Sequence, residues 1–291
     1  MAGPASFWYH TCLPPGCLLP GTSVSPIYWT TMDDREVGKL WDQNADAWTM
    51  LARMGCDIYR DYVNTPAFMK MLPDVSGMRG LDIGCGEGHN TRLVSRLGAT
   101  MVGVDISPSF VTHAGAKETA DALDIAYLAA SGCALPFVDE SFDFAVAFMS
   151  LMDMAGHEEA VREVYRVVKS GAFFQFSILH PCFCTPRFKH VLDESGERVA
   201  VECGDYFAEP QGIVEEWTFG AAPEELRASL PKFKVPRFFR TLSSWMNLLL
   251  ETGFAIEQMQ EPRADEDAIC REPHLADTLI VPIFLHVRCR K

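Results

Sequence analysis

The sequence predicts an α/β fold in which helices cover both faces of a mostly parallel sheet. Three observations predict it. Short apolar runs alternate with segments of helical spacing between residues 79 and 180. The first run ends in a glycine-rich turn that leads directly into a helical pattern. A further helical segment and two more apolar runs follow at 241–287, so the same sheet continues to the end of the chain.

Length and composition are those of an ordinary globular protein. The chain has 291 residues, of which 48% are hydrophobic and 22% charged, and it fits one large domain or one domain with an insertion. The net charge of −14 disfavours nucleic acid as a partner, because phosphate binding needs a basic surface. The apolar runs are too short to predict a membrane span, and the ten cysteines lack metal-site spacing. We therefore expect reduced thiols, no metal, no membrane and no nucleic acid.

The first 31 residues differ from the rest of the chain. They contain no Asp, Glu, Lys or Arg, and their prolines interrupt the apolar core that a secretory signal needs. We expect residues 1–31 to be a disordered leader before a natural start at Met32. Residues 32–78 are expected to form a helical cap. Apolar residues recur there at helical spacing, namely Val37, Leu40, Trp41, Ala45 and Trp48.

The stretch 81–90 organises the predicted core. An apolar run containing Asp82 leads into Gly84, Gly86 and Gly88, and a helical pattern follows. Glycine fits where the backbone takes positive φ or lies close to a ligand, and a helix start offers free N–H groups. Dinucleotide fingerprints follow Gly-x-Gly-x-x-Gly. The spacing Gly-x-Gly-x-Gly therefore disfavours an NAD site.

Two acids in this region need an explanation. Asp105 ends the strand predicted at 100–105, where nucleotide sites use an acid to accept hydrogen bonds from ribose hydroxyls. The alternative role, a helix N-cap, fits Ser107 better because Ser107 stands directly before the next helical pattern. Asp82 lies inside an otherwise apolar strand, and a buried carboxylate is costly unless it is paired or hydrogen-bonded.

The remaining core elements follow from the same patterns. Strands are predicted at 79–84, 125–129, 142–148 and 172–179, and helices at 108–120 and 157–169, the second ending at Gly171. The C-terminal part of the core, 241–291, is expected to contain a helix at 241–253 and strands at 254–260 and 279–287, the last one antiparallel. Ligands in such sheets bind at the carboxyl ends of the strands.

Residues 181–240 are too many for a plain connection between a strand and the next helix. They hold many aromatic side chains with interleaved charge, which indicates a folded insertion and not a disordered linker. Their position above the ligand-binding edge predicts a lid and substrate pocket. An oligomer interface or a plain structural cap is the alternative.

Five motifs in order carry a resemblance to a known family. They are LDIGCGEG at 81–88, VGVDIS at 102–107, LPF at 135–137, FD at 142–143 and RVVKSG at 166–171. Together they make residues 79–180 resemble the cofactor-binding core of class I S-adenosylmethionine-dependent methyltransferases, in the small-molecule branch typified by ubiquinone and menaquinone methyltransferases. The resemblance implies a Rossmann-like sheet of seven strands, mostly parallel with an antiparallel last strand, a helical N-terminal cap and an inserted lid after the fifth strand.

The resemblance also implies a site for S-adenosylmethionine. Asp82 would lie near the methionine ammonium, Asp105 at the ribose and Ile106 on the adenine face. Arg60 would meet the methionine carboxylate, because a guanidinium suits a carboxylate; the alternative is a surface ion pair with a neighbouring acid. The expected cofactor-binding residues are Tyr59, Arg60, Asp82, Gly84, Cys85, Gly86, Gly88, Asp105, Ile106, Ser131, Gly132, Cys133, Phe148 and Met149.

One position departs from the family pattern. The family usually has an acid where Ser131 stands, and that acid accepts a hydrogen bond from the adenine amino group. In this chain the Ser131 hydroxyl, or backbone groups at Gly132 and Cys133, would have to hold the adenine instead.

The expected reaction is in-line transfer of the methyl group to a small-molecule acceptor with an oxygen, nitrogen, sulfur or carbon nucleophile, which leaves S-adenosylhomocysteine. Catalysis would rest on positioning and exclusion of water, with a base only for acceptors that must lose a proton. His180 and Asp153 are the candidates for this base, with a structural histidine and a helix cap as alternatives.

We expect a cytoplasmic monomer or homodimer. An RNA or protein methyltransferase, a non-catalytic cofactor-binding module and an NAD-dependent dehydrogenase are the other functions considered.

Overall fold

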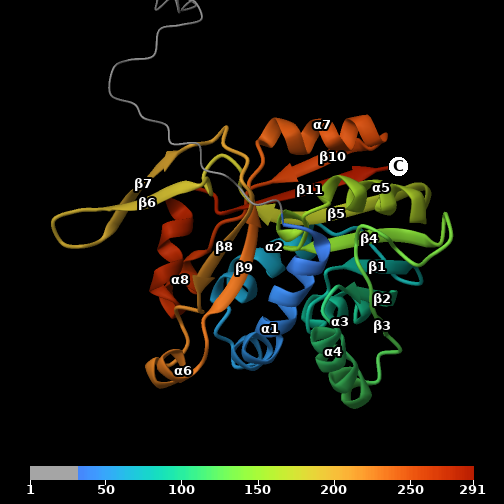
Figure 1. The fold of residues 1–291 in the computed structure, drawn as a ribbon, viewed down its shortest axis with the longest axis horizontal. Helices are drawn as coiled ribbons and strands as arrows, with labels where there is room; N and C mark the ends of the chain where they lie inside the picture. The colour runs from blue at the N-terminus through green and yellow to red at the C-terminus, as the bar shows by residue number, and fades with distance from the viewer. Residues whose placement is uncertain (1–31) are drawn as a thin grey trace, which may run out of the picture.

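The computed structural model describes residues 32–291, and the leader expected at 1–31 lies outside them. Its centre is a seven-stranded sheet with the order β10-β11-β5-β4-β1-β2-β3 (Figure 1). The strands are β1 Arg79–Ile83, β2 Thr100–Asp105, β3 Ala126–Ala129, β4 Phe142–Phe148, β5 Val168–Leu179, β10 Ala255–Gln260 and β11 Phe284–Arg290. Strands β3, β2, β1, β4 and β5 are parallel, and β11 runs antiparallel to both β5 and β10. The predicted sheet, including its antiparallel last strand, is confirmed.

Both faces of the sheet are buried. Along β4, Phe144 and Val146 face one apolar cluster, while Ala145 and Ala147 face the other. This alternation follows from the strand period of two, and burial on both sides explains the continuous apolar run.

The helices are α1 Asp34–Arg53, α2 Thr65–Met71, α3 His89–Ser95, α4 Pro108–Asp121, α5 His157–Val167, α6 Glu224–Ser229, α7 Leu242–Thr252 and α8 Glu266–Arg271. Shorter turns are the π-helix η1 Arg60–Asn64 and the 3₁₀ helices η2 Leu151–Asp153 and η3 Pro273–Leu279.

Residues 181–240 contain two antiparallel hairpins. One pairs β6 Arg187–Leu192 with β7 Arg198–Gly204, and the other pairs β8 Gln211–Trp217 with β9 Phe233–Phe238. The β6–β7 hairpin projects from the body, whereas β8 and β9 lie beside α1 (Figure 1). This second hairpin is fixed to α1, because Trp48 packs on Trp217, Phe219 and Phe233.

Two predicted boundaries are wrong. The helix expected to end at Gly171 ends at Val167, and Gly171 lies inside β5 with φ +79°. Val168 already pairs with Phe142, because a buried β-branched residue continues well as a strand. The last strand begins at Phe284 and not at 279, since residues before it form η3 and Pro282 cannot donate to a strand ladder.

Candidate functional site

A cavity of about 920 Å³ lies at the carboxyl ends of β1, β2 and β4. This volume lies toward the upper end of the range for small-molecule sites, and the walls come from α1, the glycine turn, the loop after β3, residues 181–240 and η3. Most of the predicted site residues line it. They are Tyr59, Arg60, Asp82, Gly84, Cys85, Gly86, Asp105, Ile106, Ser131, Gly132, Cys133, Phe148, Met149 and Asp153. Gly88 and His180 are not among the lining residues.

The glycine turn is built from backbone conformations that other residues rarely adopt. Gly84, Gly86 and Gly88 have φ of +71°, +55° and +82°. A Cβ on Gly84 would lie 2.4 Å from the Cβ of Ser150, whereas a Cβ on Gly86 would meet nothing within 4 Å. Gly88 lies behind the turn, where a Cβ would meet the Tyr127 hydroxyl at 2.5 Å. Gly88 therefore shapes the turn, while Gly84 and Gly86 form cavity wall.

Asp82 carries an unpaired oxygen at this wall. Its side chain is 1% exposed, and its Oδ2 accepts a hydrogen bond of 2.6 Å from the Thr91 hydroxyl. Its Oδ1 is buried and has no hydrogen-bond partner among the described residues. Burial raises the pKa of Asp82 to about 7, although the bond from Thr91 opposes this shift. A buried acceptor without a donor, at a cavity, fits a ligand that brings an ammonium group.

Asp105 is held in place by the backbone around it. Its Oδ2 accepts from the Gly86 N–H at 2.8 Å, and its Oδ1 accepts from the Ser107 N–H at 2.9 Å. Burial raises the pKa of Asp105 to about 6, against the lowering effect of these two bonds. Each carboxylate oxygen keeps a second lone pair, so the group can still accept from ribose hydroxyls.

The loop after β3 contacts a residue that the sequence reasoning missed. The Ser131 hydroxyl donates to Oδ2 of Asp34 at 2.5 Å, and the Cys133 thiol lies 3.6 Å from Oδ1 of the same carboxylate and 3.1 Å from the Gly156 carbonyl oxygen. Asp34 lies in the first turn of α1, where acids are common in any helix. No local signal could have joined it to position 131, because only the fold brings the two segments together.

Helix α1 lies across this end of the cavity. Asp42 accepts hydrogen bonds from the Ser107 hydroxyl and the Ser109 N–H, at 2.7 and 3.0 Å. Ile106 lies close to α1 at Gly38, where an added Cβ would be 3.1 Å from the Ile106 side chain. The helix is thus docked on the residues that follow β2.

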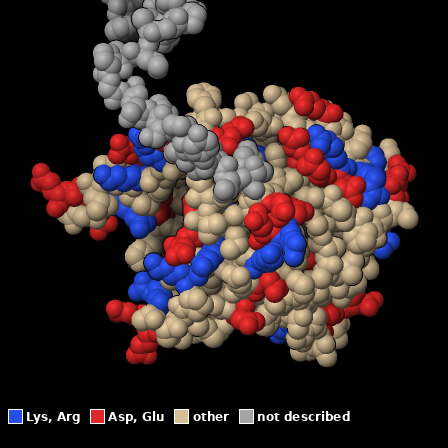
Figure 2. Space-filling model, viewed as in Figure 1, with Lys and Arg blue, Asp and Glu red and all other residues tan. Residues whose placement is uncertain are grey.

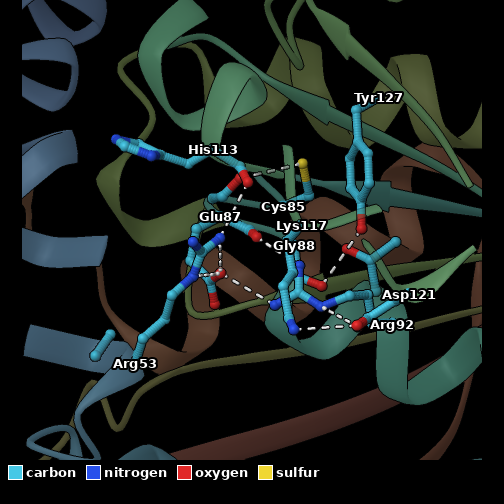
Figure 3. Close-up of polar contacts among 12 residues, drawn as sticks. Arg53, Cys85, Glu87, Gly88, Arg92, His113, Lys117, Asp121 and Tyr127 are labelled. Carbon is cyan, nitrogen blue, oxygen red and sulfur yellow. Dashed lines mark hydrogen bonds and ion pairs between the residues drawn. The ribbon is translucent and has the colours of Figure 1, made fainter. Parts of the chain in front are cut away.

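The far end of α1 is tied to the glycine turn by a buried ion-pair cluster (Figure 3). Glu87 lies between Arg53 of α1 and Arg92 of α3, with N–O distances of 2.9 and 3.0 Å. The Arg92 guanidinium also donates to the Glu87 carbonyl at 2.7 Å. These contacts were not predicted either, since they too join segments far apart in sequence.

The predicted methionine-carboxylate ligand is already paired. The Arg60 guanidinium donates to Asp61 at 2.7 Å and to the Ala52 carbonyl at 3.1 Å, which is the alternative ion pair considered from the sequence. Tyr59 lies beside a second polar group, donating to Oδ2 of Asp277 at 2.7 Å. Arg198 of β7 donates to the same oxygen at 2.7 Å, and Asp277 Oδ1 is buried without a partner among the described residues.

The end of β4 forms part of the cavity floor. Phe148 and Met149 both line the cavity, and Met149 has φ +53°, which is uncommon for a residue other than glycine. The Met149 N–H donates to the Ser177 carbonyl of β5 at 3.0 Å, which fixes this conformation. Strained backbone held by its neighbours is frequent at ligand sites.

The two catalytic candidates are both engaged elsewhere. His180 is 3% exposed, with Nε2 2.8 Å from Glu261 and Nδ1 accepting from the Cys182 N–H. Asp153 lines the cavity, but its Oδ1 accepts from Arg237 of β9 at 3.0 Å. Burial raises the pKa of Asp153 to about 6, and Arg237 opposes the shift.

Within residues 32–291 no three His, Cys, Asp or Glu side chains lie close enough to hold a metal ion. No helix of the same residues has the length and apolar character needed to cross a membrane.

Comparison with known proteins identifies relatives that share the part of the chain around the glycine turn. A methyltransferase-domain family model matches residues 81–176. The chain is 34% identical over 95 residues to a demethylmenaquinone methyltransferase of Thermus thermophilus, and 35% identical over 111 residues to a botryococcene C-methyltransferase of Botryococcus braunii. These matches cover 32% and 37% of the chain. The chain spans less than half the length of these curated relatives, 43% and 28%.

A solved structure is matched over far more of its length. The S-adenosylmethionine-dependent methyltransferase of Mesorhizobium loti is 30% identical, with a TM-score of 0.62, and the match covers 78% of this chain and 96% of that one. Because this relative is matched over nearly its whole length, and the family model spans the glycine turn and Asp105, the chain belongs to the S-adenosylmethionine-dependent methyltransferases.

Proposed function

We propose that this chain transfers the methyl group of S-adenosylmethionine to a small-molecule acceptor held between α1 and residues 181–240. The observation that carries the proposal is the cavity, in which Asp82 offers a buried unpaired oxygen beside the glycine turn and Asp105 offers acceptors at the next strand end. Together they match an amino acid joined to a ribose.

Two parts of the cofactor, the ammonium and the ribose, have a complementary side chain. Asp82 pairs with the ammonium, Gly84 and Gly86 let the backbone approach the ligand, and Asp105 accepts from the ribose hydroxyls. The sulfonium supplies a methyl group that is already activated. The protein then contributes positioning, which can lower a barrier by about 7–11 kcal/mol when two reactants are held in line.

The acceptor side is enclosed by aromatic and polar residues. Trp48, Trp217 and Phe219 line the cavity on one side, and the group of Tyr59 and Asp277 lines it on another. The Asn44 side chain fixes α1 to the insertion, because its amide donates to the Lys234 carbonyl and accepts from the Lys234 N–H, both at 2.9 Å. We propose that residues 181–240 act as a lid that excludes water during transfer.

Surface charge favours a small acceptor over RNA. On the face of residues 32–291 drawn in Figure 2, basic side chains alternate with acidic ones instead of forming one basic surface. Of the Lys and Arg residues at 232–240, Arg237 is paired with Asp153 and Glu215, and Arg240 donates to the Met154 carbonyl. Two of the curated relatives are named for botryococcene and demethylmenaquinone as acceptors.

No general base is assigned. His180 is turned away from the cavity and Asp153 holds Arg237. We propose that Asp153 positions β9 of the lid. We also propose that the acceptor is nucleophilic without a base from the protein.

The test is transfer of label from methyl-tritiated S-adenosylmethionine to a cell extract separated into small molecules, RNA and protein. We expect label in the small-molecule fraction, and at least a tenfold loss with Asp105→Ala, because a buried ribose would lose its acceptor. Label in RNA or protein would contradict the acceptor class. Binding of the cofactor without any transfer would indicate a non-catalytic module.

A further inference from the structure

We propose that Asp34 of α1 accepts a hydrogen bond from the amino group of the adenine ring of S-adenosylmethionine. The acid missing from the loop after β3 would thus be supplied by the N-terminal helix. This inference rests on the proposed function, because it assigns one contact inside the same cofactor site.

The first step is the position of the carboxylate. Asp34 lines the cavity, and its carboxylate contacts the Ser131 hydroxyl and the Cys133 thiol as described above. The loop that holds these residues directly follows the partner strand of β2, with the Ala130 N–H donating to the Asp105 carbonyl. A ribose on Asp105 therefore places its base next to this loop and next to Asp34.

The second step is the count of free acceptors at this corner. The Ser131 hydroxyl donates its one hydrogen to Asp34, and its oxygen also accepts from the Cys133 N–H at 3.0 Å. A carboxylate has about four acceptor positions, and Ser131 and Cys133 use at most two of them on Asp34, because the one thiol hydrogen of Cys133 also has the Gly156 carbonyl at 3.1 Å. Asp34 is thus better placed than Ser131 to accept from a ligand amine.

The third step is that Asp34 neither caps its helix nor forms an ion pair among the described residues. The capping box of α1 is formed by Asp33 and Glu36, so the helix start does not need the Asp34 side chain. Among residues 32–291 no Lys, Arg or His forms an ion pair with Asp34. Its charge is turned toward the cavity, and Val37 and Trp41 of the same helix face line the cavity with it.

The test pairs a change in the protein with a change in the ligand. Binding of S-adenosylhomocysteine is compared by calorimetry with binding of its purine counterpart, in which a hydrogen replaces the amino group. We expect the wild-type chain to prefer the adenine ligand by about tenfold or more, because the purine ligand lacks the donor of a charge-assisted hydrogen bond. In Asp34→Asn the preference should fall several-fold, because a neutral amide oxygen accepts more weakly than a carboxylate, and in Asp34→Ala it should disappear.

Asp46→Asn is the matched control. It removes the same charge from the same helix, and Asp46 is 90% exposed at its side chain and pairs only with His113 among the described residues. It should keep the wild-type preference. An unchanged preference in both Asp34 variants would overturn the assignment while leaving the cofactor site intact. Failure of the wild-type chain to bind either ligand would overturn the proposed function itself.

Discussion

Asp82 shows how one buried residue can oppose stability and support binding. Its carboxylate is surrounded by protein, with one oxygen on Thr91 and the other unpaired. Because burial raises its pKa to about 7, ionisation costs folding free energy. The contribution of this group to stability is full below its unfolded pKa near 4, and it is lost as the pH rises through the native pKa of about 7.

The first prediction concerns Asp82→Asn. At pH 8 the variant should be more stable than the wild type by about 1–2 kcal/mol, because an uncharged amide avoids the cost of burying a charge. The same variant should bind S-adenosylhomocysteine at least tenfold more weakly, because the ammonium loses its carboxylate. Urea unfolding and calorimetry measure the two effects, and a variant that changes both in the same direction would contradict this role.

The pH dependence of binding is the second prediction. Wild-type affinity for S-adenosylhomocysteine should fall as the pH is lowered from 8 to 5.5, because Asp82 and Asp105, with pKa values of about 7 and 6, become protonated. Asp82→Asn should show a flatter profile across the same range, since only Asp105 still titrates. Equal slopes for the two proteins would show that Asp82 does not face the ligand.

At the scale of elements, α1 connects the sheet to the inserted segment. It reaches the loop after β3 through Asp34, the start of α4 through Asp42 and the glycine turn through Arg53. On its other side, Trp48 and Asn44 hold β8 and β9. This helix therefore contacts both the strand ends beside the cavity and the inserted segment.

The third prediction concerns Asn44→Ala. Asn44 is buried, and its loss removes two hydrogen bonds and leaves the backbone groups of Lys234 unpaired, at a cost of about 2 kcal/mol. Hydrogen exchange should therefore become faster in β8 and β9 while β1, β4 and β5 stay protected. Gln43→Ala, at the neighbouring exposed position, is the control and should leave both hairpin strands unchanged. Equal exchange in the two variants would mean that Asn44 does not hold β8 and β9.

Across the whole molecule, sequence reasoning succeeded where the signal was local. The glycine turn, the strand ending at Asp105 and the alternating buried strands each depend on neighbouring residues, so their periods and turns could be predicted. The contacts of Asp34 with Ser131 and of Arg53 with Glu87 could not, because they join residues that only the fold brings together.

His180 illustrates the same limit. Its place at the end of β5 was predicted correctly, but the direction of its side chain depends on the turn that follows. There the Cys184 N–H donates to the His180 carbonyl, and the ring is held by Glu261. The end of a predicted strand shows at which edge of the sheet a residue lies. Which side chains face the cavity depends on tertiary contacts, which the local sequence does not reveal.

The central claim is that the cavity beside the glycine turn binds S-adenosylmethionine. Calorimetric titration of the chain with S-adenosylmethionine, and separately with NAD, tests it most directly. We predict saturable binding of one S-adenosylmethionine per chain and no heat with NAD at the same concentrations. Absence of S-adenosylmethionine binding, or saturable binding of NAD in its place, would contradict the account.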